Sequence, residues 1–165
     1  MSMVYWITGL SGAGKTTIGK IFYEKLKENN PNTVFLDGDI LREVFGGDLG
    51  YTEEERRKCG MRYSRLCAML EGQGMNVVCC TISMYDSVWE WNRKNIKNYK
   101  EIYIKVSLDV LYSRNQKGLY SGNGGKKVAG IQVNVEEPGN PDLVLYNDGD
   151  KTPQEQADEI LRLFC

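Results

Sequence analysis

VYWITGLSGAGKTT, residues 4–17, decides the fold, because an apolar run leads into a glycine-rich loop and then into a lysine and two threonines. The loop from Gly9 to Thr16 matches GxxxxGK[ST] at every fixed position. Glycines let backbone N–H groups wrap a phosphate, and the N-terminus of a following helix favours the same negative charge. The stretch therefore predicts a nucleotide phosphate-binding loop. A glycine turn without a ligand is the alternative, which the flanking strand and helix patterns disfavour.

The loop residues have distinct expected roles toward a bound nucleotide. Lys15 is expected to reach the β- and γ-phosphates of ATP, and the Thr16 hydroxyl is expected to bind Mg²⁺. The set expected to contact ATP comprises Gly9, Ser11, Gly12, Ala13, Gly14, Lys15, Thr16 and Thr17.

Outward from the loop, apolar runs alternate with helical patterns along the chain. Strands are expected at 4–8, 33–37, 75–83, 101–107 and 142–147, and helices at 15–29, 53–72, 86–98, 108–114 and from Pro153 onward. The alternation predicts an α/β fold over residues 1–165 as one domain, a P-loop NTPase-type doubly wound, mostly parallel five-stranded sheet with flanking helices. Residues 115–135 are rich in Gly, Lys and Asn, and we expect them to form a lid.

Composition excludes several classes of function. The 165 residues carry a net charge of −1, so no overall basic field favours nucleic acid. The absence of histidine removes His-based triads and His metal sites. Five cysteines without a CxxC pair argue against a disulfide framework. No signal peptide or membrane span is visible, so we expect a cytoplasmic chain.

Two aspartates, Asp37 and Asp39, follow the second expected strand. The strand at 75–83 ends without a carboxylate, and no guanine-reading NKxD pattern occurs, which disfavours motor ATPases and GTPases. Small-molecule kinases place an acid after the second strand, where it orders Mg²⁺ or takes the hydroxyl proton. Asp39, Asp37 and Lys15 are the candidate catalytic residues, and Thr16 with Asp39 the candidate metal ligands. In the structural alternative, Asp39 only caps a helix from Ile40 to Phe45.

Several further motifs together resemble the adenylylsulfate (APS) kinase family. They are GLSGAGKTT, LDGD followed by Arg42, DLGYTEEER, the TIS strand end, KGLY and EEPGNPDL, and they occur in the family's order over about residues 1–150. The resemblance implies transfer of the ATP γ-phosphate, with Mg²⁺, to the 3′-hydroxyl of a small nucleotide whose 5′-phosphate carries a second anionic group. Family members are typically dimers, so a homodimer is expected.

Carried over to this sequence, the resemblance implies how the acceptor binds. Arg42 and Arg56 are expected to bind the 5′ anionic group, and Tyr51 is expected to stack on the base. Asp39, with Asp37, is expected beside the 3′-hydroxyl and Mg²⁺.

The resemblance also implies roles for positions farther along the chain. Arg114 is expected near the adenine or the phosphates of ATP, and Lys117 at the root of the lid. Further acceptor contacts are expected from Cys59, Ile82, Ser83 and Val128.

The sequence departs from the family pattern at the acceptor base. The family usually has asparagine at the positions of Ile40 and Cys59, FISPxR where this chain has TISMYD, and an aromatic residue at the position of Val128. The loss of one stacking wall disfavours a purine, because each stacked base contributes about 1–3 kcal/mol. The resemblance then implies phosphorylation of cytidine 5′-diphosphoramidate in bacterial capsule phosphoramidate synthesis. An ordinary APS kinase and a non-catalytic nucleotide-binding module are the alternatives.

Overall fold

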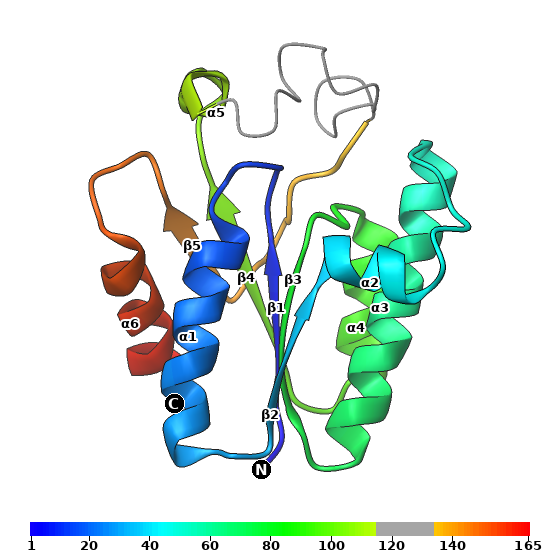
Figure 1. Cartoon of the computed structure of the whole chain (residues 1–165), viewed down its shortest axis with the longest axis vertical. Coiled ribbons are helices and arrows are strands. Elements are labelled where there is room, and N and C mark those ends of the chain that lie inside the picture. The colour runs from blue at the N-terminus through cyan, green and yellow to red at the C-terminus, as the bar shows by residue number, and fades with distance from the viewer. Residues whose placement is uncertain (115–133) are drawn as a thin grey trace.

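A computed structural model describes residues 1–114 and 134–165. Its single sheet has the strand order β2-β3-β1-β4-β5, and all four pairings are parallel (Figure 1). The strands are β1 (Val4–Thr8), β2 (Thr33–Asp37), β3 (Asn76–Thr81), β4 (Tyr99–Lys105) and β5 (Leu143–Tyr146). The expected doubly wound sheet is therefore confirmed, and β5 lies at one edge.

Helices cover both faces of the sheet, as Figure 1 shows. The helices are α1 (Lys15–Asn29), α2 (Gly38–Val44), α3 (Glu53–Gly72), α4 (Asp86–Asn95), α5 (Leu108–Arg114) and α6 (Pro153–Phe164). Helices α1 and α6 pack together on one face, and α3 and α4 pack together on the other. The two shortest helices, α2 and α5, follow β2 and β4 directly, so they lie at the edge where the strands end.

Three expected boundaries were wrong around the fourth strand, and one of them is its end, which lies at Lys105 and not at residue 107. Helix α4 ends at Asn95, three residues before the expected end, because Ile96 takes an extended conformation. Strand β4 begins at Tyr99, which pairs with Val4, two residues earlier than the apolar run at 101–107 indicated. Pairing with the central strand thus decides where β4 starts.

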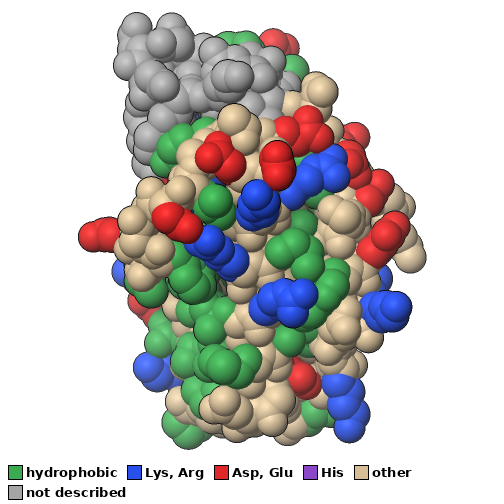
Figure 2. Space-filling model, turned by 90° about the vertical axis from the view of Figure 1, so that its right-hand side faces the viewer, with side chains coloured by type: hydrophobic (Ala, Val, Ile, Leu, Met, Phe, Trp, Pro, Cys, Tyr) green, Lys and Arg blue, Asp and Glu red, His purple; other side chains and the backbone are tan. Residues whose placement is uncertain are grey.

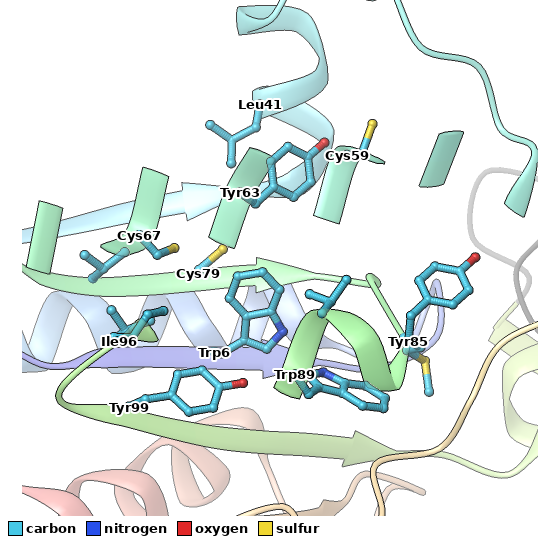
Figure 3. Close-up of a cluster of buried hydrophobic side chains, with 14 of the residues drawn as sticks. Trp6, Leu41, Cys59, Tyr63, Cys67, Cys79, Tyr85, Trp89, Ile96 and Tyr99 are labelled. Atoms are coloured by element: carbon cyan, nitrogen blue, oxygen red, sulfur yellow. The ribbon is translucent and has the colours of Figure 1, made fainter. Parts of the chain in front are cut away.

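The strands alternate their side chains between two buried clusters. Trp6 and Cys79 face α3 and α4, whereas Ile7 and Cys80 face α1 and α6. Figure 3 shows the first cluster, in which Trp6 lies between the two helices and the sheet. Because successive side chains point to opposite faces, strands covered on both sides are apolar throughout, as the run at 75–83 indicated.

Local capping signals fix two of the helices. Thr52 and Glu55 form a capping box at the start of α3. Thr152 and Glu155 form a second capping box at α6, with Pro153 in the first turn. These contacts satisfy N–H groups that would otherwise lack partners at the helix N-terminus.

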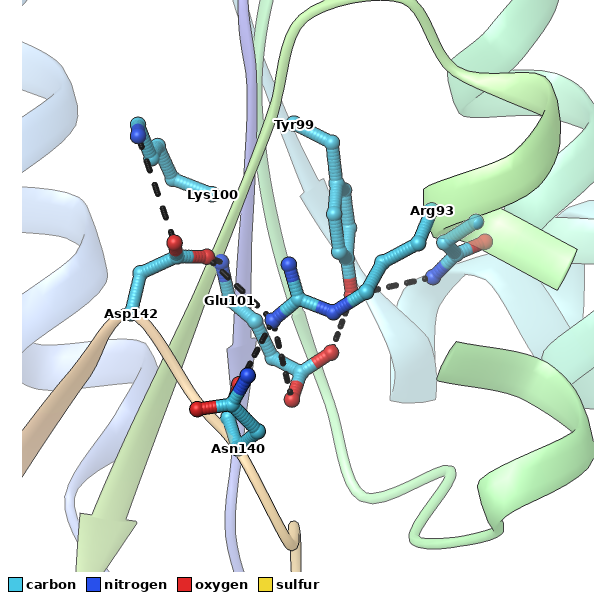
Figure 4. A network of polar contacts seen from close by, with 7 residues as sticks. Arg93, Tyr99, Lys100, Glu101, Asn140 and Asp142 are labelled. Carbon is cyan, nitrogen blue, oxygen red and sulfur yellow. Dashed lines mark hydrogen bonds and ion pairs between the residues drawn. The ribbon is translucent and has the colours of Figure 1, made fainter. Parts of the chain in front are cut away.

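A polar network ties the start of β4 to the segment that leads into β5 (Figure 4). The Arg93 guanidinium donates to the Asn140 carbonyl over 2.8 Å and lies 3.6 Å from the Glu101 carboxylate. Asp142 accepts from the Glu101 backbone N–H over 2.7 Å. Burial raises the pKa of Glu101, whose carboxylate also accepts from the Tyr99 hydroxyl. The network therefore anchors one end of the segment at 134–142.

Figure 2 shows the side of the molecule that carries α3 and α4, where Lys and Arg side chains alternate with apolar ones. All five cysteines are free thiols, which confirms the expectation against a disulfide framework. None of the helices in residues 1–114 and 134–165 has the length and apolar character needed to cross a membrane.

Candidate active site

Predicted site residues of the described part of the chain follow three neighbouring strands, at the carboxyl ends of the sheet. The phosphate loop follows β1, the two aspartates follow β2, and Ile82 and Ser83 follow β3. Because all strands are parallel, these segments meet at their carboxyl ends, where α2 and α3 also begin (Figure 1). Open α/β sheets bind their ligands at this edge.

The backbone of the phosphate loop takes a conformation that requires glycine at two positions. Gly12 and Gly14 have φ angles of 82° and 102°, which residues other than glycine rarely adopt. Gly14 is the N-cap of α1, and no side chain caps this helix. The N–H groups of the first turn thus remain available to an anion, as a phosphate-binding helix terminus requires.

Two side chains from distant parts of the chain hold this loop. Arg114 donates to the carbonyls of Gly12 and Asn147, which places it beside the loop, while its expected contact with ATP stays a prediction. The buried Asn147 amide donates to the Ala13 carbonyl over 2.8 Å. A Cβ atom at Gly14 would lie only 2.5 Å from this amide. Sequence reasoning missed Asn147, which follows the edge strand and carries no motif.

Lys15 and Thr16 extend the loop toward the second strand. The Lys15 ammonium donates to the Leu10 carbonyl over 2.8 Å, so its side chain folds back over the loop. The Thr16 hydroxyl donates to the Asp37 carboxylate over 2.7 Å. A hydroxyl and a carboxylate beside a phosphate cradle are oxygen ligands of the kind Mg²⁺ prefers, so the residues present fit this ion.

The two aspartates differ in their surroundings. Asp37 is 9% exposed and caps α2, because its carboxylate accepts from the Asp39 backbone N–H over 2.9 Å. The structural alternative that Asp39 caps a helix over 40–45 is therefore wrong, since the cap lies two residues earlier. The Asp39 residue is exposed at the site edge. Its assignment as catalytic and metal-binding residue stays a prediction, and the contact with Thr16 adds Asp37 as a candidate metal ligand.

Three predicted acceptor residues form a stack at the start of α3. The Arg42 guanidinium lies 4.2 Å from the centre of the Tyr51 ring, and that of Arg56 lies 5.3 Å from it. Arg42 also donates to the carbonyls of Leu49 and Gly50, over 3.0 and 2.9 Å. Arg56 donates to the Tyr51 carbonyl over 3.0 Å. Two guanidinium groups held on one ring make a local cationic platform in a chain of net negative charge.

A pocket of about 120 Å³ lies beside this stack, between α2, α3 and the loop that joins them. Cys59 lines it and is buried, so this predicted residue lies within reach of Arg42 and Tyr51. Tyr63 closes the pocket on the helix side, and burial raises the pKa of its hydroxyl. The lining residues are Arg42, Phe45, Gly47, Asp48, Leu49, Tyr51, Cys59, Arg62 and Tyr63.

Ser83 has a strained backbone at the end of β3. Its φ angle of 33° places a residue other than glycine in the left-handed region, a strain that often marks functional sites. The buried Ser83 and Thr81 hydroxyls lie 2.7 Å apart, within hydrogen-bond distance. The Ile82 carbonyl accepts from the Thr8 hydroxyl, so this turn is fixed to the end of β1.

Two predicted acceptor contacts, Lys117 and Val128, lie outside the described residues, as does the expected lid apart from its last two positions. Their roles stay predictions.

Sequence comparisons with known proteins identify the family to which the chain is similar. The family model described as adenylylsulphate kinase matches residues 1–146. A cytidine diphosphoramidate kinase of Campylobacter jejuni is 39% identical over 162 residues, which cover 96% of this chain and 94% of that protein. A probable adenylyl-sulfate kinase of Archaeoglobus fulgidus is 36% identical over 151 residues, which cover 90% of this chain and 97% of that protein.

The solved structures agree as well. The APS kinase of Mycobacterium tuberculosis, in complex with AMPPNP and APS, superposes with a TM-score of 0.85 at 29% identity, covering 98% of this chain and 96% of that one. The chain belongs to the adenylylsulphate kinase family of ATP-dependent phosphotransferases.

Proposed function

We propose that this chain transfers the γ-phosphate of ATP to the ribose 3′-hydroxyl of cytidine 5′-diphosphoramidate, as a step of capsule phosphoramidate synthesis. The observation that carries the proposal is the cationic platform of Arg42, Tyr51 and Arg56 at the edge that holds the phosphate loop. A nucleotide whose 5′ end carries two charged groups matches two guanidinium groups, which bind phosphate oxygens with paired donors. The similarity to the Campylobacter jejuni kinase supports the choice of acceptor.

On the donor side, the backbone of residues 9–14 would hold the ATP phosphates, and Lys15 would add its positive charge. Thr16, with Asp37 or Asp39, would hold Mg²⁺, which neutralises charge on the phosphates when bound. The contacts of Asn147 and Arg114 keep this cradle in place before ATP arrives. Binding then costs less, because little of the loop has to be ordered.

On the acceptor side, Asp39 would orient the 3′-hydroxyl and accept its proton. Arg42 and Arg56 would hold the 5′ end, so that the sugar alcohol faces the γ-phosphate. Cys59 and Val128 stand where the family has an asparagine and an aromatic residue, and a smaller base needs less of such a pocket. We also propose that the enzyme is a homodimer, which light scattering of the purified chain would test.

Adenylyl-sulfate is the second candidate acceptor. The family match and the Archaeoglobus fulgidus relative favour it. A non-catalytic nucleotide-binding module is a third possibility. It would show no ADP release with any acceptor.

A coupled assay for ADP release separates these three possibilities. We expect kcat/KM for cytidine 5′-diphosphoramidate to exceed that for adenylyl-sulfate by at least about tenfold, the effect of a single 1.4 kcal/mol contact. Lys15→Ala should abolish turnover, whereas Lys20→Ala, an exposed position on the same helix, should leave it unchanged. A higher kcat/KM with adenylyl-sulfate would refute the proposed acceptor.

A further inference from the structure

Tyr85 carries a buried hydroxyl for which the residues at 1–114 and 134–165 provide no hydrogen-bond partner. The residue is 1% exposed. Buried polar groups are normally paired, and this hydroxyl is one of five unpaired buried side-chain atoms in the described residues, the others belonging to Trp6, Ser64, Trp89 and Asn92. The position of the Tyr85 hydroxyl next to the acceptor site suggests that the missing partner belongs to a substrate.

The backbone places Tyr85 at the edge where the strands end. It stands two residues after the strained Ser83, to whose carbonyl its N–H donates over 3.1 Å, and it is the N-cap of α4. The Arg57 guanidinium lies 4.7 Å from the centre of its ring. In Figure 3 the Tyr85 hydroxyl points away from Trp89 and the core. The ring is therefore held by packing, and its polar end is left for another contact.

Arg56 of the cationic platform is the charged group that acts most strongly on Tyr85. Burial raises the pKa of the Tyr85 hydroxyl, and the Arg56 charge opposes this effect more than any other charge does. Burial lowers the pKa of Arg56, and among the neighbouring titratable groups Tyr85 opposes this lowering most. The phenol thus stays protonated at neutral pH, next to a guanidinium expected to bind the 5′ group.

The carboxylates nearest to Tyr85 are already engaged. Glu53 lies 2.7 Å from the Arg57 guanidinium. Glu136 accepts from the Asp86 backbone N–H over 2.8 Å and also faces Arg57 at 3.5 Å. Tyr85 therefore contributes a neutral oxygen that can both donate and accept a hydrogen bond.

We propose that the Tyr85 hydroxyl distinguishes a terminal nitrogen from a terminal oxygen on the 5′ group of the acceptor. The inference rests on the proposed function. Guanidinium groups only donate, so Arg42 and Arg56 bind phosphate or sulfate oxygens but cannot accept from an N–H. The phosphoramidate nitrogen carries N–H donors, and the phenol oxygen accepts one of them. A terminal phosphate oxygen already receives hydrogen bonds from the guanidinium groups, so toward it the phenol would be only one more donor. Tyr85 is then a specificity-determining residue.

Tyr85→Phe tests this role because it removes only the hydroxyl. Values of kcat/KM are measured with cytidine 5′-diphosphoramidate and with cytidine 5′-diphosphate, which differ in a single terminal atom. We expect the ratio of the two values to fall about tenfold or more, with the KM for ATP unchanged. Tyr5→Phe is the matched control, since Tyr5 is a buried tyrosine in the cluster that faces α1 and α6. It should leave the ratio as it is in the wild type.

Thermal unfolding separates recognition from a structural role. Because the hydroxyl has no partner in the described residues, Tyr85→Phe should keep or raise Tm, whereas loss of a structural hydrogen bond would lower it. An equal change with both cytidine acceptors, or none, would overturn the inference and leave the proposed function standing. A wild-type enzyme that prefers adenylyl-sulfate would overturn both, and that result is read before any variant is made.

Discussion

Asn147 provides a direct test of how the phosphate loop is held. Its amide donates to the Ala13 carbonyl over 2.8 Å, and Ala13 is only 1% exposed. Asn147→Ala leaves this buried acceptor without its partner, which costs about 1–3 kcal/mol. For a chain of this size, 1 kcal/mol shifts Tm by about 2–4 °C, so we expect Tm to fall by about 2–12 °C.

The same substitution should weaken ATP binding selectively. The loss releases the backbone around Gly14, against which the Asn147 amide packs. If the whole cost falls on the loop, the KM for ATP rises by about 5- to 150-fold, because 1.4 kcal/mol corresponds to a factor of ten. The KM for the acceptor should change little, since Arg42 and Arg56 make their contacts elsewhere. Steady-state assays with each substrate varied in turn measure both values.

Asn98→Ala is the matched control for this experiment. Asn98 also donates one side-chain hydrogen bond, over 3.0 Å to Glu71, but it precedes β4 at the opposite end of the sheet. It should lower Tm and leave the KM for ATP unchanged. If Asn147→Ala and Asn98→Ala gave the same pattern, the Asn147 amide would serve stability alone, and its role in the cradle would be refuted.

Three further changes test other parts of the structure. Asp39→Asn should lower kcat by about 100-fold or more with little effect on Tm. Asp37→Ala should also lower Tm, because it removes the side-chain oxygen that caps α2; equal effects of the two changes in kinetics and unfolding would contradict this division. Arg42→Lys keeps the charge but loses the planar guanidinium that lies over the Tyr51 ring, so we expect the KM for the acceptor to rise about tenfold while that for ATP stays constant. The pKa of Glu101 is raised in the folded state, so its contribution to stability is complete below its unfolded pKa of about 4.3 and is lost as pH rises through the folded value. Urea unfolding of the wild type and of Glu101→Gln measures this effect. Between pH 4 and pH 7 the free energy of unfolding of the wild type should fall relative to that of the variant. A difference that does not change with pH would count against burial as the cause.

Local signals explain why the phosphate loop and the start of α3 could be predicted from the sequence. The phosphate loop and the capping box at Thr52 each depend on residues within a few positions of one another. Such motifs fix backbone conformation directly, so the spacing of a few residue types is enough to find them. The mostly parallel five-stranded sheet followed in the same way from the alternation of apolar runs and helices, whereas its strand order came from the structure.

Long-range contacts explain what the sequence could not show. Asn147 lies 134 positions from the carbonyl that it binds, and no motif marks it. Asp37, and not only Asp39, became a candidate metal ligand because its carboxylate faces Thr16, and this is decided by where α2 begins. A residue that acts through a distant partner can be found from sequence only when its partner is already known.

The ATP side and the proposed acceptor side of the site differ in whether backbone or side chains make the contacts. This difference suggests how members of the family could come to bind different acceptors. The ATP side is a backbone cradle, held in shape by Asn147 and Arg114, so a change of side chain there disturbs the phosphate contacts themselves. The proposed acceptor side would instead consist of side chains, among them Arg56 on α3 and Tyr85 at the start of α4. Substitutions on this side can alter the recognised 5′ group or base while the donor chemistry stays intact. A family with a single phosphoryl donor can therefore acquire new acceptors one side chain at a time.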